Sequence, residues 1–328
     1  MIPLSEKDTV TKEYMQNRET FADAFNFYLY DGEQIIKPEQ LKPLDTTAIA
    51  LPYGEDGKSV PVQKYRDVLK MVTAMTDDHA AYLILGIENQ SKIHYAMPVR
   101  NMLYDSLQYT AQVDQIAKSH RSEKDKAESS DEFLSGFYRT DKLLPVYTLT
   151  IYWGADEWTA PKDLHSMLTA EPVMLKFIDN YHLHLITPAS ISDSDFTKFH
   201  SELNAALKFI KYSNDNKELD RVLHDDIVYT DVSWETAKVI SIMTGTEIPY
   251  NKEKGRVNVC KAVEDMKTNA KNEGIAEGRA EGMAEGMNKG ILETLVGLVK
   301  DGFISLAEAA KCANMTVSEF EDKTGLKA

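Results

Sequence analysis

Cysteine is almost absent from the chain: Cys260 and Cys312 are the only two among 328 residues. Two cysteines are too few for a disulfide framework or for a cysteine zinc site. No stretch reaches the roughly 18 apolar residues that a membrane-spanning helix needs. The first residues lack a basic segment followed by an apolar one, so we expect no signal peptide and no membrane partner. Together these absences predict a cytoplasmic protein.

Basic residues are also scarce relative to acidic ones. The chain has 37 Lys and Arg against 52 Asp and Glu, which gives a formal net charge of −15. Because non-specific DNA affinity comes from basic side chains that neutralise phosphates, this balance argues against an indiscriminate polyanion binder. Any DNA-binding face must concentrate its bases locally. Hydrophobic residues still make up 43% of the chain, enough for a sizeable core.

The hydrophobic pattern predicts an α/β (or α+β) fold with a mixed sheet. The first thirty residues contain one clear helix, which follows Arg18 and ends at Asp31-Gly32. The strongest strand candidates, 66–75 and 81–90, are apolar on both faces, as central strands are. The remaining elements are strands near 44–51, 146–153 and 181–187 and helices near 95–118, 196–212 and 232–243.

Two acidic residues are expected to meet on the hairpin formed by the two central strands. With 76–79 as the loop, paired positions sum to 155, so Asp67 lies opposite Glu88. Gln90 is two residues further along the strand and shares that face. Opposed carboxylates on an apolar hairpin are destabilising, and a divalent cation would compensate them. The alternative is that these are ordinary polar residues at a strand end.

The segment before Glu88 is locally basic. Between residues 57 and 70, four basic side chains stand against Asp67 alone. Bases beside an acid pair suit an anionic substrate held near a metal, although a solvated basic patch would look the same. These basic residues are Lys58, Lys64, Arg66 and Lys70.

Several motifs occur along the chain in a recognisable order. They are KYRDVL at 64–69, GIENQS at 86–91, then Tyr95, Met97 and Arg100, then Tyr152-x-Gly154 with Trp158 and Pro161, and a Glu-Gly-rich tail. Together they resemble the Rpn family of recombination-promoting nucleases, described as putative transposases of the PD-(D/E)XK nuclease superfamily. The resemblance covers nearly the whole chain and implies a restriction-endonuclease-like core with α-β-β-β-α-β order.

The resemblance also implies a site. A magnesium-type divalent cation would be held by Asp67 and Glu88, with help from the backbone carbonyl of Asn89. Gln90 stands where the superfamily usually has lysine, and it would orient water or phosphate without supplying charge. The acid often found on the first helix has two candidates here, which stay open, and four basic residues are candidates for substrate binding. These candidates are Glu19 and Asp23 for the acid, and Lys64, Arg66, Lys70 and Arg100 for the substrate.

The implied activity is that of a hydrolase, a metal-dependent DNA endonuclease of PD-(D/E)XK type associated with transposition or recombination. One alternative is a nuclease fold that has lost activity and serves as a DNA-binding or regulatory module, which the missing lysine favours. Another is an assembly protein that works through its tail.

Glu-Gly pairs recur every four residues from 273 to 286 in that tail. The repeat predicts a helix that approaches another helix closely, as in a homo-oligomer, or a flexible spacer. Short helices are expected at 291–300, 305–313 and 316–323, the last two capped by Ser305 and Thr316. We therefore divide the chain into a core (1–215, with a flexible insertion about 119–132), a helical extension (216–270) and a tail (271–328).

Overall fold

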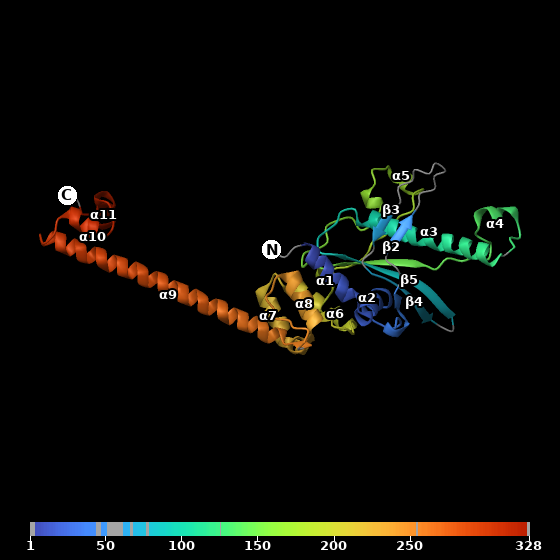
Figure 1. Ribbon diagram of the computed structural model, residues 1–328, viewed down its shortest axis with the longest axis horizontal. Helices are drawn as coiled ribbons and strands as arrows, with labels where there is room; N and C mark the ends of the chain where they lie inside the picture. Colours follow the sequence, from blue (N-terminus) through green and yellow to red (C-terminus); the bar gives the residue numbers. More distant parts are fainter. Residues whose placement is uncertain are drawn as a thin grey trace. The chain divides into compact units, whose positions relative to one another are not determined.

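The computed structural model describes residues 4–43, 47–50, 62–65, 68–76, 79–124, 126–253 and 255–326 (Figure 1). The chain forms two compact units, Met1–Val263 and Glu264–Ala328. Within these described ranges, no helix has both the length and the apolar composition needed to cross a membrane.

The first unit is built around a mixed five-stranded sheet, which confirms the predicted α/β class. β4 pairs antiparallel with β1 and β5, whereas β5, β6 and β7 are parallel to one another. Two short antiparallel pairs, β2 with β3 and β8 with β9, lie outside this sheet. In spatial order the main strands are β1 (Lys42–Pro43), β4 (Val68–Thr76), β5 (His79–Gln90), β6 (Val146–Tyr152) and β7 (His184–Ile186). The short strands are β2 (Thr47–Ala50), β3 (Val62–Tyr65), β8 (Val232–Ser233) and β9 (Arg256–Val257).

The predicted hairpin register is confirmed. Every β4–β5 pair, from Val68 opposite Ile87 to Thr76 opposite His79, sums to 155. The predicted four-residue loop is too long, because Thr76 and His79 themselves pair and extend the ladder. A two-residue connection is the commonest hairpin length, so the longer ladder agrees with ordinary turn preferences.

Helices cover both faces of the sheet (Figure 1). The face that carries Leu85 and Ile87 of β5 and Leu149 and Ile151 of β6 packs into one large core with several helices. The opposite face is covered by α3 (Met97–Glu123), whose Asn101 side chain reaches Thr150 of β6. The core helices are α1 (Leu4–Gln16), α2 (Arg18–Tyr30), α6 (Leu203–Tyr212), α7 (Asn216–Asp225) and α8 (Trp234–Thr244).

The N-terminal region differs from the prediction, because it contains two helices where one was expected. Asn17 separates them and caps α2, its side chain accepting hydrogen bonds from the backbone amides of Glu19 and Thr20. α1 was missed because its sequence is mostly polar; among its residues with described side chains, Val10, Tyr14 and Met15 make the buried apolar contacts. Tertiary packing stabilises this helix where its own periodicity is weak.

The predicted flexible insertion, 119–132, is also wrong at both ends. α3 runs into it, and a short helix α4 (Ser130–Ser135) begins inside it. The His120 ring stacks on Tyr138 with 3.7 Å between centroids, and its Nε2 lies 2.9 Å from Asp141. The polar composition of the segment predicted disorder. The contacts of His120 with Tyr138 and Asp141 nevertheless order it, although it has no hydrophobic core.

Two smaller differences concern residues 172–203 of the first unit. The helix predicted to begin near residue 196 begins at Leu203, after a short 3-10 turn over Asp195–Lys198. A further short helix, α5 (Pro172–Leu175), lies between β6 and β7.

The second unit is helical, as predicted for the C-terminal region. α9 (Val259–Lys300) is one helix of 42 residues that includes the segment 291–300 predicted as separate. α10 (Leu306–Cys312) and α11 (Val317–Thr324) follow and pack with its end around Phe320. The predicted caps Ser305 and Thr316 are confirmed, each completing a capping box.

Candidate functional site

The candidate site lies at the end of β5, under the first turns of α3. The Glu88 side chain is fully buried. Parallel pairing places Glu88 beside Thr150 and Gln90 beside Tyr152 of β6, so these four residues share one face of the sheet. Above them, Asn101 of α3 donates a hydrogen bond from Nδ2 to Thr150 Oγ1 at 2.9 Å. A glutamate thus lies in a closed polar layer between the sheet and α3.

Arg100 provides positive charge at this glutamate. One of its terminal nitrogens lies 3.3 Å from Glu88 Oε2, and its side chain is 37% exposed while that of Glu88 is not exposed at all. Its Nε donates a hydrogen bond to the hydroxyl of Tyr104 at 3.0 Å. Because an isolated buried carboxylate is very costly, this ion pair stabilises the ionised form of Glu88.

The two residues after Glu88 point to opposite faces. Asn89 Oδ1 accepts a hydrogen bond from Trp153 Nε1 at 2.9 Å on the core side of the sheet. Gln90 stays on the Glu88 face, and its Nε2 donates to the Asn89 backbone carbonyl at 2.9 Å. The carbonyl predicted as a metal ligand is therefore in contact with the Gln90 side chain.

A second acidic residue, missed from the sequence, lies further along the same face. Asp105 of α3 is buried, and its two carboxylate oxygens accept hydrogen bonds from Thr148 Oγ1 at 2.5 Å and from the Tyr181 hydroxyl at 2.6 Å. Polar side chains at 100, 101, 104 and 105 occupy one helix face, where an apolar stripe is usual. That i, i+1, i+4, i+5 spacing was the signal that could have revealed this polar layer.

Lys70 does not fit the predicted substrate contact. It pairs with Leu85, on the core face of the sheet, and is buried. Its ammonium donates to the backbone carbonyl of Gln16 at 2.9 Å and lies 4.4 Å from the centre of the Phe21 ring. Burial, with a smaller contribution from the charge of Arg18, lowers the pKa of Lys70 to about 8. The inference that Lys70 points away from the acidic face is confirmed.

The two candidates for the first-helix acid, Asp23 and Glu19, differ in their burial and contacts. Asp23 is buried, and its carboxylate accepts hydrogen bonds from the backbone amides of His200 and Ser201 at 2.9 and 2.8 Å. The Ser201 hydroxyl donates a third at 2.6 Å. Asp23 therefore anchors a loop on the core side of the sheet, the face opposite Glu88. Glu19 is exposed near the start of α2.

Two candidates, Asp67 and Arg66, lie outside the described residues, so the predicted pairing of Asp67 with Glu88 remains a prediction. The backbone of Lys64 belongs to β3, whereas its side chain is not described.

A divalent cation such as Mg²⁺ needs hard oxygen ligands close together. Among the described residues, no group of three or more His, Cys, Asp or Glu side chains is close enough to hold a metal ion. The Glu88 carboxylate and the Asn89 carbonyl are nevertheless the hard oxygen donors that Mg²⁺ prefers. Mg²⁺ sites commonly use one or two carboxylates with waters and substrate phosphate, so this donor set fits such a cation.

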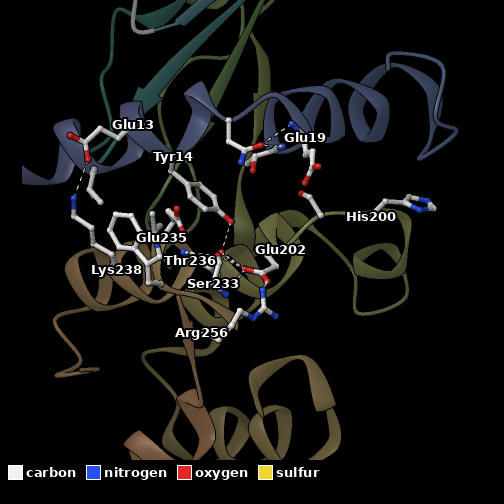
Figure 2. Close-up of a pocket in the computed structure, with 16 residues that line it drawn as sticks. Glu13, Tyr14, Glu19, His200, Glu202, Ser233, Glu235, Thr236, Lys238 and Arg256 are labelled. Carbon is white, nitrogen blue, oxygen red and sulfur yellow. Dashed lines mark hydrogen bonds and ion pairs between the residues drawn. The ribbon is translucent and has the colours of Figure 1, made fainter. Parts of the chain in front are cut away.

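A cavity of about 530 Å³ opens elsewhere, between α1, the start of α2, the loop before α6 and α8 (Figure 2). At its floor, Glu202 Oε2 accepts hydrogen bonds from Ser233 and Thr236, and the Tyr14 hydroxyl lies 3.1 Å from Thr236 Oγ1. Burial alone would raise the pKa of Glu202, but those hydrogen bonds and Arg256 hold it below its usual value. These polar groups satisfy one another, so the cavity floor is a structural network.

Comparison with known families supplies an independent result. Residues 5–232 match the family model described as "Putative transposase, YhgA-like". Neither the curated proteins nor the solved structures searched gave a match. The match covers α1 through β8, and so includes the sheet, α3 and Glu88. The chain therefore belongs to the YhgA-like family of putative transposases.

Proposed function

We propose that this protein is a metal-dependent DNA endonuclease that hydrolyses phosphodiester bonds during transposition or recombination. The observation that carries the proposal is the placement of Glu88, a fully buried carboxylate at the end of a central strand with Gln90 on the same face. Burying a carboxylate there costs stability, and such sites are enriched in functional residues. The family supports a role related to transposition.

The proposed site would use a Mg²⁺-type cation, which supplies an activated water and neutralises charge on the scissile phosphate when bound. Glu88 is the ligand among the described residues, and Asp67 is the predicted second one. The Asn89 carbonyl is a third oxygen donor. Gln90, whose amide already contacts that carbonyl, would orient the attacking water or a phosphate oxygen.

The net charge of −15 sets the expected mode of DNA binding. Most of the surface repels a polyanion, so binding should be salt-sensitive and confined to one face, near Arg100 of α3. Occupation of the site by the cation would further reduce the repulsion near Glu88.

One observation favours the alternative function, in which an inactive nuclease fold serves as a DNA-binding or regulatory module. Gln90 is neutral, and Glu88 already has a counter-charge from Arg100. A buried carboxylate with its own cation on a neighbouring helix is compatible with a purely structural ion pair. Cleavage assays separate the two functions.

Supercoiled plasmid would be incubated with purified full-length protein in Mg²⁺ or in EDTA. We expect nicking or linearisation in Mg²⁺, none in EDTA, and loss of activity in Glu88→Ala and Asp67→Ala. Glu39→Gln, an exposed acid just before β1 that is not a candidate site residue, is the matched control and should keep full activity. Cutting that survives both alanine substitutions would refute the proposed site, and DNA binding without cutting in any metal would favour the alternative function.

A further inference from the structure

The charge that Gln90 lacks is available from α3. We propose that Arg100 is the catalytic cation of this site, contacting a non-bridging oxygen of the scissile phosphate, and that Tyr104 is its positioning residue. This inference rests on the proposed endonuclease function. It assigns to a helix the role that a lysine on β5 would otherwise have.

The geometry brings the guanidinium to the place where a lysine at position 90 would act. Glu88 and Gln90 share one face of β5, and Arg100 reaches that face from the first turn of α3, 3.3 Å from Glu88 Oε2. Lys70 cannot substitute, because its ammonium is buried on the opposite face. Of these two candidate cations, Arg100 alone is on the catalytic side of the sheet.

Tyr104 fixes the orientation of the guanidinium. It lies one helical turn after Arg100, accepts the Nε hydrogen bond at 3.0 Å, and has its ring centre 5.6 Å from the guanidinium carbon. Because Nε is held by the Tyr104 hydroxyl, the terminal nitrogens are left to face Glu88. A guanidinium carries five N–H donors in a planar fork, so it can contact a carboxylate and a phosphate oxygen together.

The exposure of the pair suits an approaching DNA backbone. Glu88 is closed to solvent while 37% of the Arg100 side chain is open. Arg100 therefore connects a buried acid with the surface that a phosphate would reach.

The chemistry requires positive charge at that position. The oxygen of water forms a bond to phosphorus while the bond from phosphorus to the leaving oxygen breaks. The water loses a proton to solvent and the leaving oxygen gains one, so atoms and charge balance. Negative charge accumulates on the non-bridging oxygens in between, and a preorganised donor there typically contributes about 10²–10³ in rate.

The test compares Arg100→Gln, Arg100→Lys, Gln90→Lys, Tyr104→Phe and the double variant Arg100→Gln/Gln90→Lys in the full-length protein. Single-turnover cleavage of a labelled duplex in Mg²⁺ is measured beside duplex binding in EDTA, and thermal unfolding checks the fold. We expect Arg100→Gln to lose about 100-fold in rate with DNA affinity changed far less. Arg100→Lys keeps the charge but loses the fork and the Nε bond to Tyr104, so it should recover only part of the rate, and Tyr104→Phe should fall between the wild type and Arg100→Gln. The double variant should regain at least part of the loss.

A readout independent of cleavage is Mg²⁺ affinity by calorimetry. Removing the positive charge beside Glu88 should strengthen cation binding in Arg100→Gln but not in Arg100→Lys. Wild-type cleavage equalled by Arg100→Gln would overturn the assignment of Arg100 and leave the endonuclease proposal intact. A double variant no faster than Arg100→Gln, or unchanged Mg²⁺ affinity, would also overturn it. A wild type inactive with every cation would instead overturn the proposed function, and this assignment with it.

Discussion

Substitution of Asp23 tests whether this buried acid stabilises the fold and takes no part in catalysis. Its carboxylate holds the loop before α6 through three hydrogen bonds from His200 and Ser201. In Asp23→Asn one acceptor oxygen becomes a donor that faces another donor, so at least one buried partner loses its bond. We expect a loss of about 3 kcal/mol in the free energy of unfolding, since hydrogen bonds to charged groups contribute roughly 1.5–3 kcal/mol each.

Urea unfolding followed by tryptophan fluorescence measures this loss. Trp153, Trp158 and Trp234 are the only tryptophans, and all lie in the first compact unit, so the signal reports on that unit alone. Glu19→Gln, on the same helix four residues earlier and exposed, should change stability by less than about 0.5 kcal/mol.

Activity completes the Asp23 comparison. Where Asp23→Asn remains folded, its rate of DNA cleavage should match that of the wild type, because Asp23 lies on the face opposite Glu88. A variant as stable as the wild type, or one folded but inactive, would contradict the anchoring role and restore Asp23 as a candidate catalytic acid.

Three further predictions follow from the structure. Burial lowers the pKa of Lys70 from 10.5 to about 8. Between pH 8 and pH 10.5 the folded state has therefore lost a proton that the unfolded state still binds. The free energy of unfolding of the wild type should rise over this pH range, relative to that of Lys70→Met, by up to about 3 kcal/mol. Urea titrations across that range check this, with exposed Lys118→Met as control, and parallel curves for wild type and Lys70→Met would refute it. Gly282→Ala should increase the helicity of α9, since an added Cβ meets nothing within 4 Å and alanine is favoured over glycine by about 1 kcal/mol; an unchanged circular dichroism melting curve would argue against it. We also propose that α9 mediates a homo-oligomer, so a chain ending near Lys271 should sediment with a smaller number of subunits than the full chain, whereas an equal number would exclude that role.

The sequence predicted the centre of the sheet well because its signals are local. Two apolar runs separated by a short polar turn define a hairpin, and the period of two fixes which residues share a face. The same period of two places Glu88 and Gln90 on one face of the sheet and Lys70 on the other. The caps Ser305 and Thr316 were equally local, since a capping box needs only four residues.

What was missed depends on partners distant in the chain. Asp23 is identified as an anchor only when the loop at His200, 177 residues later, folds against it. The same holds for Asp105, whose partners come from β6 and from the segment before β7. Local patterns in one sequence carry no information on contacts between residues that are distant in the chain. In the sequence, a buried carboxylate with three hydrogen-bond partners cannot be distinguished from an exposed one.

The most direct test of the central claim, that Glu88 is a ligand of a catalytic divalent cation, is calorimetric titration of Mg²⁺ or Mn²⁺ into the full-length wild type and Glu88→Gln. We predict one site per chain in the wild type and an affinity at least about tenfold weaker in Glu88→Gln, in line with the loss of a carboxylate ligand. Equal affinities in the two proteins would contradict the claim.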